Sequence, residues 1–160
     1  MKLLDIDDLW VRFPTSTGLF EAVRGVSFSL GRERLGVVGE SGSGKSMTGR
    51  AILRLIRPPG EVQARHIALQ GVNLLDLPKK AMRAVRGQVL SVIDRLVEER
   101  GMGLIFISED LNLVAQFCDR MLIMYAGRVV ETCPVDDLHA AQHPFTHHLL
   151  ESAFRFVRNG

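Results

Sequence analysis

One stretch decides the fold, and it reads Gly39-Glu40-Ser41-Gly42-Ser43-Gly44-Lys45-Ser46. It matches the pattern G-x-x-x-x-G-K-[ST] at every fixed position. An apolar run at 34–39 precedes it, and a helical pattern at 45–55 follows it. A buried strand, a glycine-rich loop and a helix in this order are the context in which the pattern forms a phosphate-binding loop. The sequence therefore predicts an anion site at 39–46.

The residue types in this loop suit the chemistry of phosphate binding. Gly42 and Gly44 let the backbone wrap around an anion, and the small serines beside them leave the amide hydrogens facing inward. A helix that begins near Lys45 directs the positive end of its dipole at the phosphates. We expect Lys45 to reach the β- and γ-phosphates of a nucleotide and the Ser46 hydroxyl to ligate Mg²⁺. An unrelated glycine-rich turn is the alternative, and the complete strand–loop–helix order disfavours it.

Apolar patterning outside the loop predicts strands that alternate with helices. Period-two patterns and short continuous apolar runs indicate strands, whereas apolar residues at helical spacing indicate helices. The predicted strands lie at 3–13, 20–30, 34–39, 66–70, 104–108, 120–125 and 128–131, with 74–77 extended. The predicted helices lie at 45–55 (ended by the prolines at 58–59), 78–86, 89–100, 111–117, 135–141 and 145–157. This alternation predicts an α/β fold, with a parallel sheet flanked by helices and preceded by antiparallel strands.

Length and composition describe one globular domain. The chain has 160 residues, of which 46% are hydrophobic and 24% are charged. Lysines and arginines number 20 against 18 acidic residues, and this balance argues against a nucleic-acid binder. Two cysteines cannot build a disulfide framework. No apolar run approaches the roughly 18 residues of a membrane span, so we expect a cytosolic protein that meets a membrane only through a partner.

Three further segments and the loop at 39–46 together resemble one protein family. Residues 103–111 read Gly-Leu-Ile-Phe-Ile-Ser-Glu-Asp-Leu, residues 118–128 read Cys-Asp-Arg-Met-Leu-Ile-Met-Tyr-Ala-Gly-Arg, and residues 143–146 read His-Pro-Phe-Thr. In this order they resemble the H-loop strand, the strand and hairpin after it, and the start of the C-terminal extension in ABC-transporter ATPases of the oligopeptide/dipeptide importer branch. The resemblance covers nearly the whole chain.

The resemblance implies a P-loop ATPase core over residues 1–160, in which residues 134–160 are the start of an importer-type C-terminal extension. It implies ATP and Mg²⁺ as ligands, a second ATPase subunit and transmembrane permease subunits as partners, and a cytoplasmic position on the inner face of the cell membrane. It places Phe13 where the family has an aromatic residue that stacks on adenine; an ordinary apolar residue at a strand end is the alternative. The expected nucleotide-binding residues are Phe13, Gly39, Glu40, Ser41, Gly42, Ser43, Gly44, Lys45, Ser46 and Met47, with Ser46 also the expected magnesium ligand.

The chain departs from the family pattern at two places. Between Gln88 and Val89 a large block is missing, which in the family carries the Q-loop, the helical subdomain with its LSGGQ-type segment, the Walker B aspartate and the catalytic glutamate. Glu109 stands where the family has its switch histidine, and a carboxylate there repels a phosphate. The alternative makes Glu109 and Asp110 ordinary acids at a helix N-terminus. We therefore expect impaired hydrolysis and weak binding of ATP or ADP.

The resemblance also predicts how the parallel strands lie. The strand at 120–125, the strand before the phosphate loop and the strand at 104–108 are expected side by side in that order. The missing strands would have flanked 104–108, so its apolar edge is left uncovered, and such an edge invites pairing with another chain. We expect poor solubility as a consequence.

Two other functions remain open from the sequence. The chain can be a non-catalytic module that pairs with an intact ATPase or with a membrane subunit, or, with less support, a small P-loop kinase whose lid would be the basic segment at 83–100.

His139, His143 and His147 recur every four residues, but Pro144 interrupts a continuous helix through them, so a metal site there is disfavoured.

Overall fold

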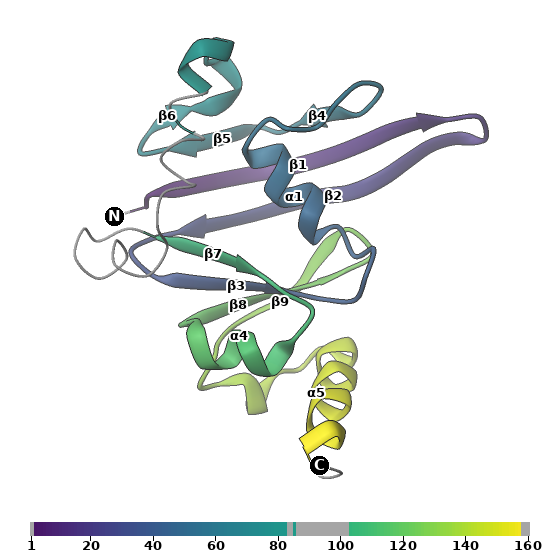
Figure 1. The fold of residues 1–160 in the computed structure, drawn as a ribbon, viewed down its shortest axis with the longest axis vertical. Coiled ribbons are helices and arrows are strands. Elements are labelled where there is room, and N and C mark those ends of the chain that lie inside the picture. The colour runs from purple at the N-terminus through teal and green to yellow at the C-terminus, as the bar shows by residue number, and fades with distance from the viewer. Residues whose placement is uncertain (1, 83–84, 86–102, 158–160) are drawn as a thin grey trace.

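The computed structural model describes residues 2–82, 85 and 103–157. Within them the chain forms two sheets that share one core, with α4 and α5 on the far side of the smaller sheet (Figure 1). The described part of the chain is an α/β fold, as the sequence predicts. The predicted helix at 89–100, the junction at 88–89 and most of the basic segment at 83–100 lie outside the described residues.

The larger sheet is antiparallel and is built on a long hairpin. Its strand order is β2-β1-β5-β6, and β4 pairs with β1 beside β5. The hairpin and the strand predicted at 66–70 are confirmed, whereas the short strands β4 and β6 were not predicted. The bounds are β1 Leu4–Thr15, β2 Gly18–Leu30, β4 Glu61–Gln63, β5 His66–Leu69 and β6 Val72–Asn73.

The smaller sheet carries the parallel strands. Its order is β7-β3-β8-β9, where β3 is parallel to both of its neighbours and β9 is antiparallel to β8. This confirms the predicted order of the three parallel strands. In the part of the chain that the structure describes, β7 pairs with β3 alone and is an edge strand. The bounds are β3 Arg34–Val38, β7 Leu104–Ile107, β8 Arg120–Tyr125 and β9 Arg128–Pro134.

Helix α1 spans Lys45–Ile52 and ends earlier than predicted. Its C-terminus is closed by Arg54 in the left-handed conformation (φ 52°). The Arg54 amide donates to Ala51 O at 2.9 Å, and the Leu55 amide donates to Arg50 O at 2.7 Å. These two bonds form a Schellman motif, which satisfies the last carbonyls of the helix. The prolines at 58–59 therefore do not end α1, and the predicted extension to residue 55 is wrong.

Two short segments differ from the sequence prediction because local hydrogen bonds decide them. Leu74–Asp76 is a 3₁₀ turn rather than extended, since the Asn73 side chain accepts a bond from the Leu75 amide and starts a helical turn. The predicted helix at 135–141 shortens to a 3₁₀ turn at Leu138–Ala140. Helices α4 (Leu111–Phe117) and α5 (Pro144–Val157) form where predicted, and 79–82 is helical.

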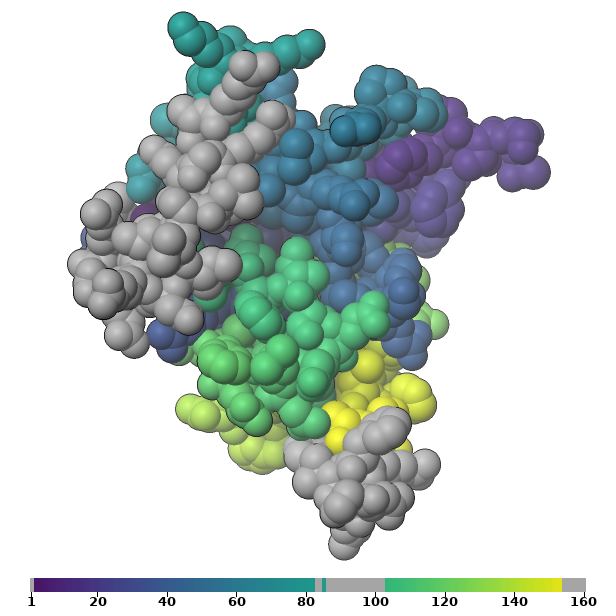
Figure 2. Space-filling view, viewed as in Figure 1, coloured from purple at the N-terminus to yellow at the C-terminus, as the bar shows by residue number. Residues whose placement is uncertain are grey.

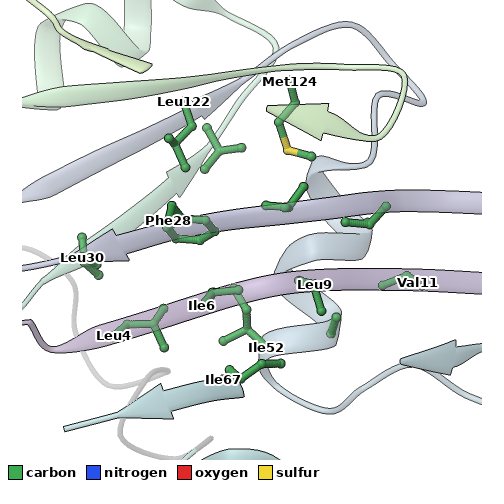
Figure 3. Close-up of a cluster of buried hydrophobic side chains, with 14 of the residues drawn as sticks. Leu4, Ile6, Leu9, Val11, Phe28, Leu30, Ile52, Ile67, Leu122 and Met124 are labelled. Carbon is green, nitrogen blue, oxygen red and sulfur yellow. The ribbon is translucent and has the colours of Figure 1, made fainter. Parts of the chain in front are cut away.

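The buried side chains form two clusters, one on each side of the smaller sheet. The first fills the space between the two sheets and α1 (Figure 3). The second packs β8 and β9 against α4 and α5, and contains the buried free thiols Cys118 and Cys133. Residues that Figure 3 labels in the first cluster are Leu4, Ile6, Leu9, Val11, Phe28, Leu30, Ile52, Ile67, Leu122 and Met124.

An ion pair fastens the amino-terminal end of the smaller sheet to the hairpin. The Arg120 guanidinium donates to both Glu33 oxygens, at 3.1 and 2.7 Å, and to Ser29 O at 2.6 Å. Both side chains are about three-quarters buried, since 24% and 27% of their surfaces are exposed. The Arg120 guanidinium holds the pKa of the Glu33 carboxyl below its ordinary value, against the opposing effect of burial.

We expect Glu33→Gln to lower the free energy of unfolding by about 1–2 kcal/mol at pH 7. Because the pKa of Glu33 is lowered on folding, its contribution is complete above the ordinary value of 4.5 and is lost as pH falls through the folded value. The difference between Glu33→Gln and the unaltered chain should therefore shrink below pH 4.5 in urea titrations. Glu61→Gln, at an exposed site on β4, is the matched control; a gap that stays constant down to pH 3 contradicts the assignment.

Candidate functional site

The loop at 39–44 lies where the parallel strands end. It follows β3 directly, and the register places Val37 beside Ile107 of β7 and Val38 beside Ile123 of β8. The carboxyl ends of all three strands therefore meet at this edge of the sheet. In open α/β sheets this edge is where ligands bind.

The loop forms a cradle, and at two of its positions, Gly39 and Gly44, neighbouring backbone leaves no room for a side chain. Gly39 has φ +153°, and an added Cβ would lie 2.2 Å from Met124 O. Gly44 has φ +100°, and its Cβ would lie 2.6 Å from Ala22 O. Gly42 has φ +80° in open space, so only its backbone angle requires glycine. The residues present therefore fit a group that needs close backbone approach, such as a nucleotide phosphate.

A chain of backbone hydrogen bonds holds this cradle to both sheets. The Ser43 amide donates to Glu40 O at 3.1 Å and closes the turn of the loop. The Gly127 amide, in the β8–β9 turn, donates to Ser43 O at 3.0 Å, and the Arg24 amide of β2 donates to Gly127 O at 2.8 Å. The cradle is thus fixed from two directions by segments distant in sequence.

Lys45 begins α1 and is buried, with 5% of its surface exposed. Its ammonium donates to Gly39 O and to Glu40 O, both at 2.7 Å, and to Ser43 Oγ at 3.4 Å. Burial lowers the pKa of Lys45 from its ordinary value, while the carboxylates of Glu109 and Glu40 oppose the change. The predicted phosphate-binding cation therefore lies inside the loop, as that role requires.

Glu109 faces this cation from the junction of β7 and α4. Its Oε1 lies 3.9 Å from Lys45 Nζ, and 65% of its side chain is exposed. The neighbouring Asp110 caps α4, because its Oδ1 accepts a bond from the Leu113 amide at 3.1 Å. The interpretation as ordinary helix-start acids thus describes Asp110, whereas the Glu109 carboxylate lies beside Lys45 of the loop.

The remaining predicted residues lie in the loop, at the start of α1 and on the wall of a cavity. Ser46 is exposed at the start of α1, as are Glu40 and Ser41 in the loop. Phe13 and Met47, half-buried, line one cavity of about 500 Å³. Its other walls are Arg50, Leu55, Ile56 and Arg57. The two arginines were not predicted from the sequence, because single basic residues are usually solvated.

Figure 2 shows the part of the surface where α1, in blue, adjoins the β7–α4 segment, in green. The same proximity appears at Gly49 of α1, where a Cβ would lie 3.0 Å from Ile107 Cδ1.

Among the residues that the structure describes, no group of three or more His, Cys, Asp or Glu side chains could hold a metal ion, so the histidine series at 139–147 forms no such cluster there. None of the described helices is long and apolar enough to cross a membrane.

Solved structures similar to this chain are ABC cassettes. A dimeric bacterial ABC transporter cassette, MJ0796, matches with a TM-score of 0.68 at 12% identity, over 82% of this chain and 98% of the other. The cbiO1 protein from Clostridium perfringens, part of the ABC transporter complex cbiONQ, matches with a TM-score of 0.67 at 14% identity, over 94% of this chain and 99% of the other. At these identities the likeness shows the fold.

Similar sequences carry importer names. The oligopeptide transport ATP-binding protein OppD of Bacillus subtilis (strain 168) is 45% identical over 94 residues, which are 58% of this chain but only 26% of OppD. A putative peptide import ATP-binding protein of Brucella abortus (strain 2308) is 27% identical over 254 aligned positions, covering 94% of this chain and 76% of the relative. The glutathione import ATP-binding protein GsiA of Escherichia coli (strain K12) is 43% identical over 81 residues, 49% of this chain and 13% of GsiA.

The family model described as "ABC transporter" matches residues 23–128, which is well over half of the chain. The match includes the phosphate loop, Glu109 and the β8–β9 turn, all of which the structure brings to one site. The fold agrees with this match, since the similar solved structures are ABC cassettes. The chain belongs to the ABC transporter family and is an ATP-binding domain of that family.

Proposed function

We propose that this chain binds the phosphates of ATP or ADP through residues 39–46, as an ATP-binding subunit of a peptide-type ABC importer whose own hydrolysis is impaired. The observation that carries the proposal is the cradle itself, in which the left-handed Gly39 and Gly44 approach neighbouring backbone where no side chain fits. Lys45, buried inside the loop, supplies the matching positive charge.

Each residue of the loop has a role in this proposal. The amides of the glycine-rich turn hold the α- and β-phosphates, and Lys45 reaches the β- and γ-phosphates. The exposed hydroxyl of Ser46 ligates Mg²⁺, which when bound neutralises phosphate charge. Phe13 and Met47 border one cavity, which supports a place for the base against Phe13.

The importer assignment rests on the named relatives. OppD, the Brucella peptide import protein and GsiA all carry transport or import names, and the resemblance at 143–146 points to the same branch. By this proposal a second ATPase subunit and transmembrane permease subunits are the partners, and the chain lies on the inner face of the cell membrane. The substrate would be a peptide or a similar small solute.

Impaired hydrolysis follows from what the sequence lacks. No apolar strand in it ends in Asp-Glu in the Walker B manner, and the block expected between residues 88 and 89 is missing. The alignment with the Brucella relative supports this, since it runs over 254 positions although this chain has only 160 residues. Removing one preorganised group commonly costs about 10²–10³ in rate, and this chain lacks several.

Calorimetry with ADP and ATP, with Mg²⁺ present, tests the binding, and release of inorganic phosphate tests the hydrolysis. We expect heat of binding for both nucleotides and no phosphate release above that of the Lys45→Ala variant. If neither nucleotide binds, the proposal as a whole is contradicted. Turnover that depends on Lys45 contradicts impaired hydrolysis and also the non-catalytic alternative, whereas transfer of phosphate to an added acceptor would favour a kinase.

A further inference from the structure

We propose that Glu109 makes this site select nucleoside diphosphates over triphosphates. The inference rests on the proposed nucleotide binding at 39–46 and concerns which nucleotide the loop retains. It starts from one contact, the 3.9 Å between Lys45 Nζ and Glu109 Oε1.

The ammonium of Lys45 has few directions left for a ligand. An ammonium group has three hydrogens to donate. Gly39 O and Glu40 O accept at 2.7 Å each, while the bond to Ser43 Oγ is longer, at 3.4 Å. The Glu109 carboxylate lies beside the same buried nitrogen. A phosphate held by Lys45 therefore comes close to the negative charge of Glu109.

The backbone around Glu109 is anchored on both sides. The Ser108 amide donates to Val37 O at 3.2 Å, which ties the end of β7 to β3. The Asp110 amide donates to Ser108 Oγ at 3.0 Å, and Asp110 caps α4. Because its two neighbours are held, the backbone of residue 109 stays at the edge of the loop, and its largely exposed carboxylate can reach Lys45.

The two nucleotides depend on Lys45 to different degrees. The β-phosphate is held by the amides of the loop as well as by the lysine, whereas the γ-phosphate relies on the lysine. Lys45 and Glu109 together carry no net charge, so the lysine attracts a terminal phosphate less strongly. A γ-phosphate also brings additional negative charge close to the carboxylate. Water around the exposed carboxylate screens this repulsion, so we expect a preference for ADP of about 3- to 10-fold.

The test compares ADP with a non-hydrolysable ATP analogue by calorimetry, in EDTA so that no divalent ion screens the phosphates. The unaltered chain should bind ADP about 3- to 10-fold more tightly than the analogue. Glu109→Gln should tighten analogue binding by about that factor and change ADP binding by less than about 2-fold. Raising the salt concentration should reduce the preference of the unaltered chain. Glu151→Gln, which removes an exposed carboxylate from α5, is the matched control and should change neither affinity.

The outcomes separate this inference from the proposal beneath it. Equal affinities in the unaltered chain, or a Glu109→Gln variant that tightens both ligands alike, overturn the selectivity and leave nucleotide binding in place. A chain that binds neither ligand overturns both. If Glu109→Gln unfolds at the same temperature as the unaltered chain, the altered affinity ratio comes from the site and not from a change in the fold.

Discussion

Lys45→Ala will weaken ADP binding by about 10- to 100-fold without unfolding the chain. Hydrogen bonds to a charged group are worth about 1.5–3 kcal/mol, and Lys45 is the cation that begins α1 inside the phosphate loop. The variant also removes the donor that Gly39 O and Glu40 O share. The alanine variant also no longer has to remove a charge from water on folding. This gain partly offsets the lost hydrogen bonds, so the free energy of unfolding should change little.

Calorimetry with ADP measures this effect, and Lys79→Ala is its matched control. Lys79 is exposed at the start of the 79–82 helical turn, so its removal takes away the same charge far from the loop in sequence. We expect Lys79→Ala to bind ADP as the unaltered chain does. If both variants bind ADP with the unaltered affinity, the loop at 39–46 is not the nucleotide site.

Gly36→Ala will lower the free energy of unfolding by about 1–3 kcal/mol. Gly36 lies in the middle of β3, where a Cβ would come 2.0 Å from Val114 Cγ1 of α4 and 3.3 Å from Cys118 Sγ. Val114 is fully buried, so it has no free space into which to move. The added methyl must therefore displace α4 from the central strand, which overpacks the second core cluster.

A double-mutant cycle identifies the cause of this loss. Val114→Ala removes the clashing methyl, so Gly36→Ala/Val114→Ala should be more stable than the sum of the single changes by at least about 1 kcal/mol in urea titrations. Gly49→Ala is the matched control, because its Cβ would meet only the tip of the half-exposed Ile107 side chain, at 3.0 Å. Additive effects at residues 36 and 114 contradict the steric explanation.

The parts of the fold that were predictable from sequence are those with strong local or family signals. The loop at 39–46 has a fixed pattern, and the parallel strands around it are continuous apolar runs. The order of these strands in the sheet followed from the family resemblance. The end of α1 was not predictable, because Arg54 adopts a left-handed angle that its residue type does not favour. The turn at Leu74–Asp76 depended on one Asn73 side-chain bond, which apolar periodicity does not register.

The sequence indicated the residues of the candidate site but not the contacts between them. The sequence indicated Lys45 and Glu109 separately, one from the loop pattern and one from a departure at the H-loop. Their ion pair depends on the parallel register of β3 and β7, which brings positions far apart in the chain to one edge. Arg50 and Arg57 of the cavity wall were missed for the same reason, since only the folded chain sets them beside Phe13.

The bonds that join Arg24, Gly127 and Ser43 have a consequence for how much of the chain can change. These three residues belong to β2, to the β8–β9 turn and to the loop itself, and all three lie outside the stretch 83–102. The mould for the anion is thus assembled by segments on either side of that stretch. Variants that insert or remove residues there can keep an intact mould, so nucleotide retention and ATP-driven work are separable traits in such a chain.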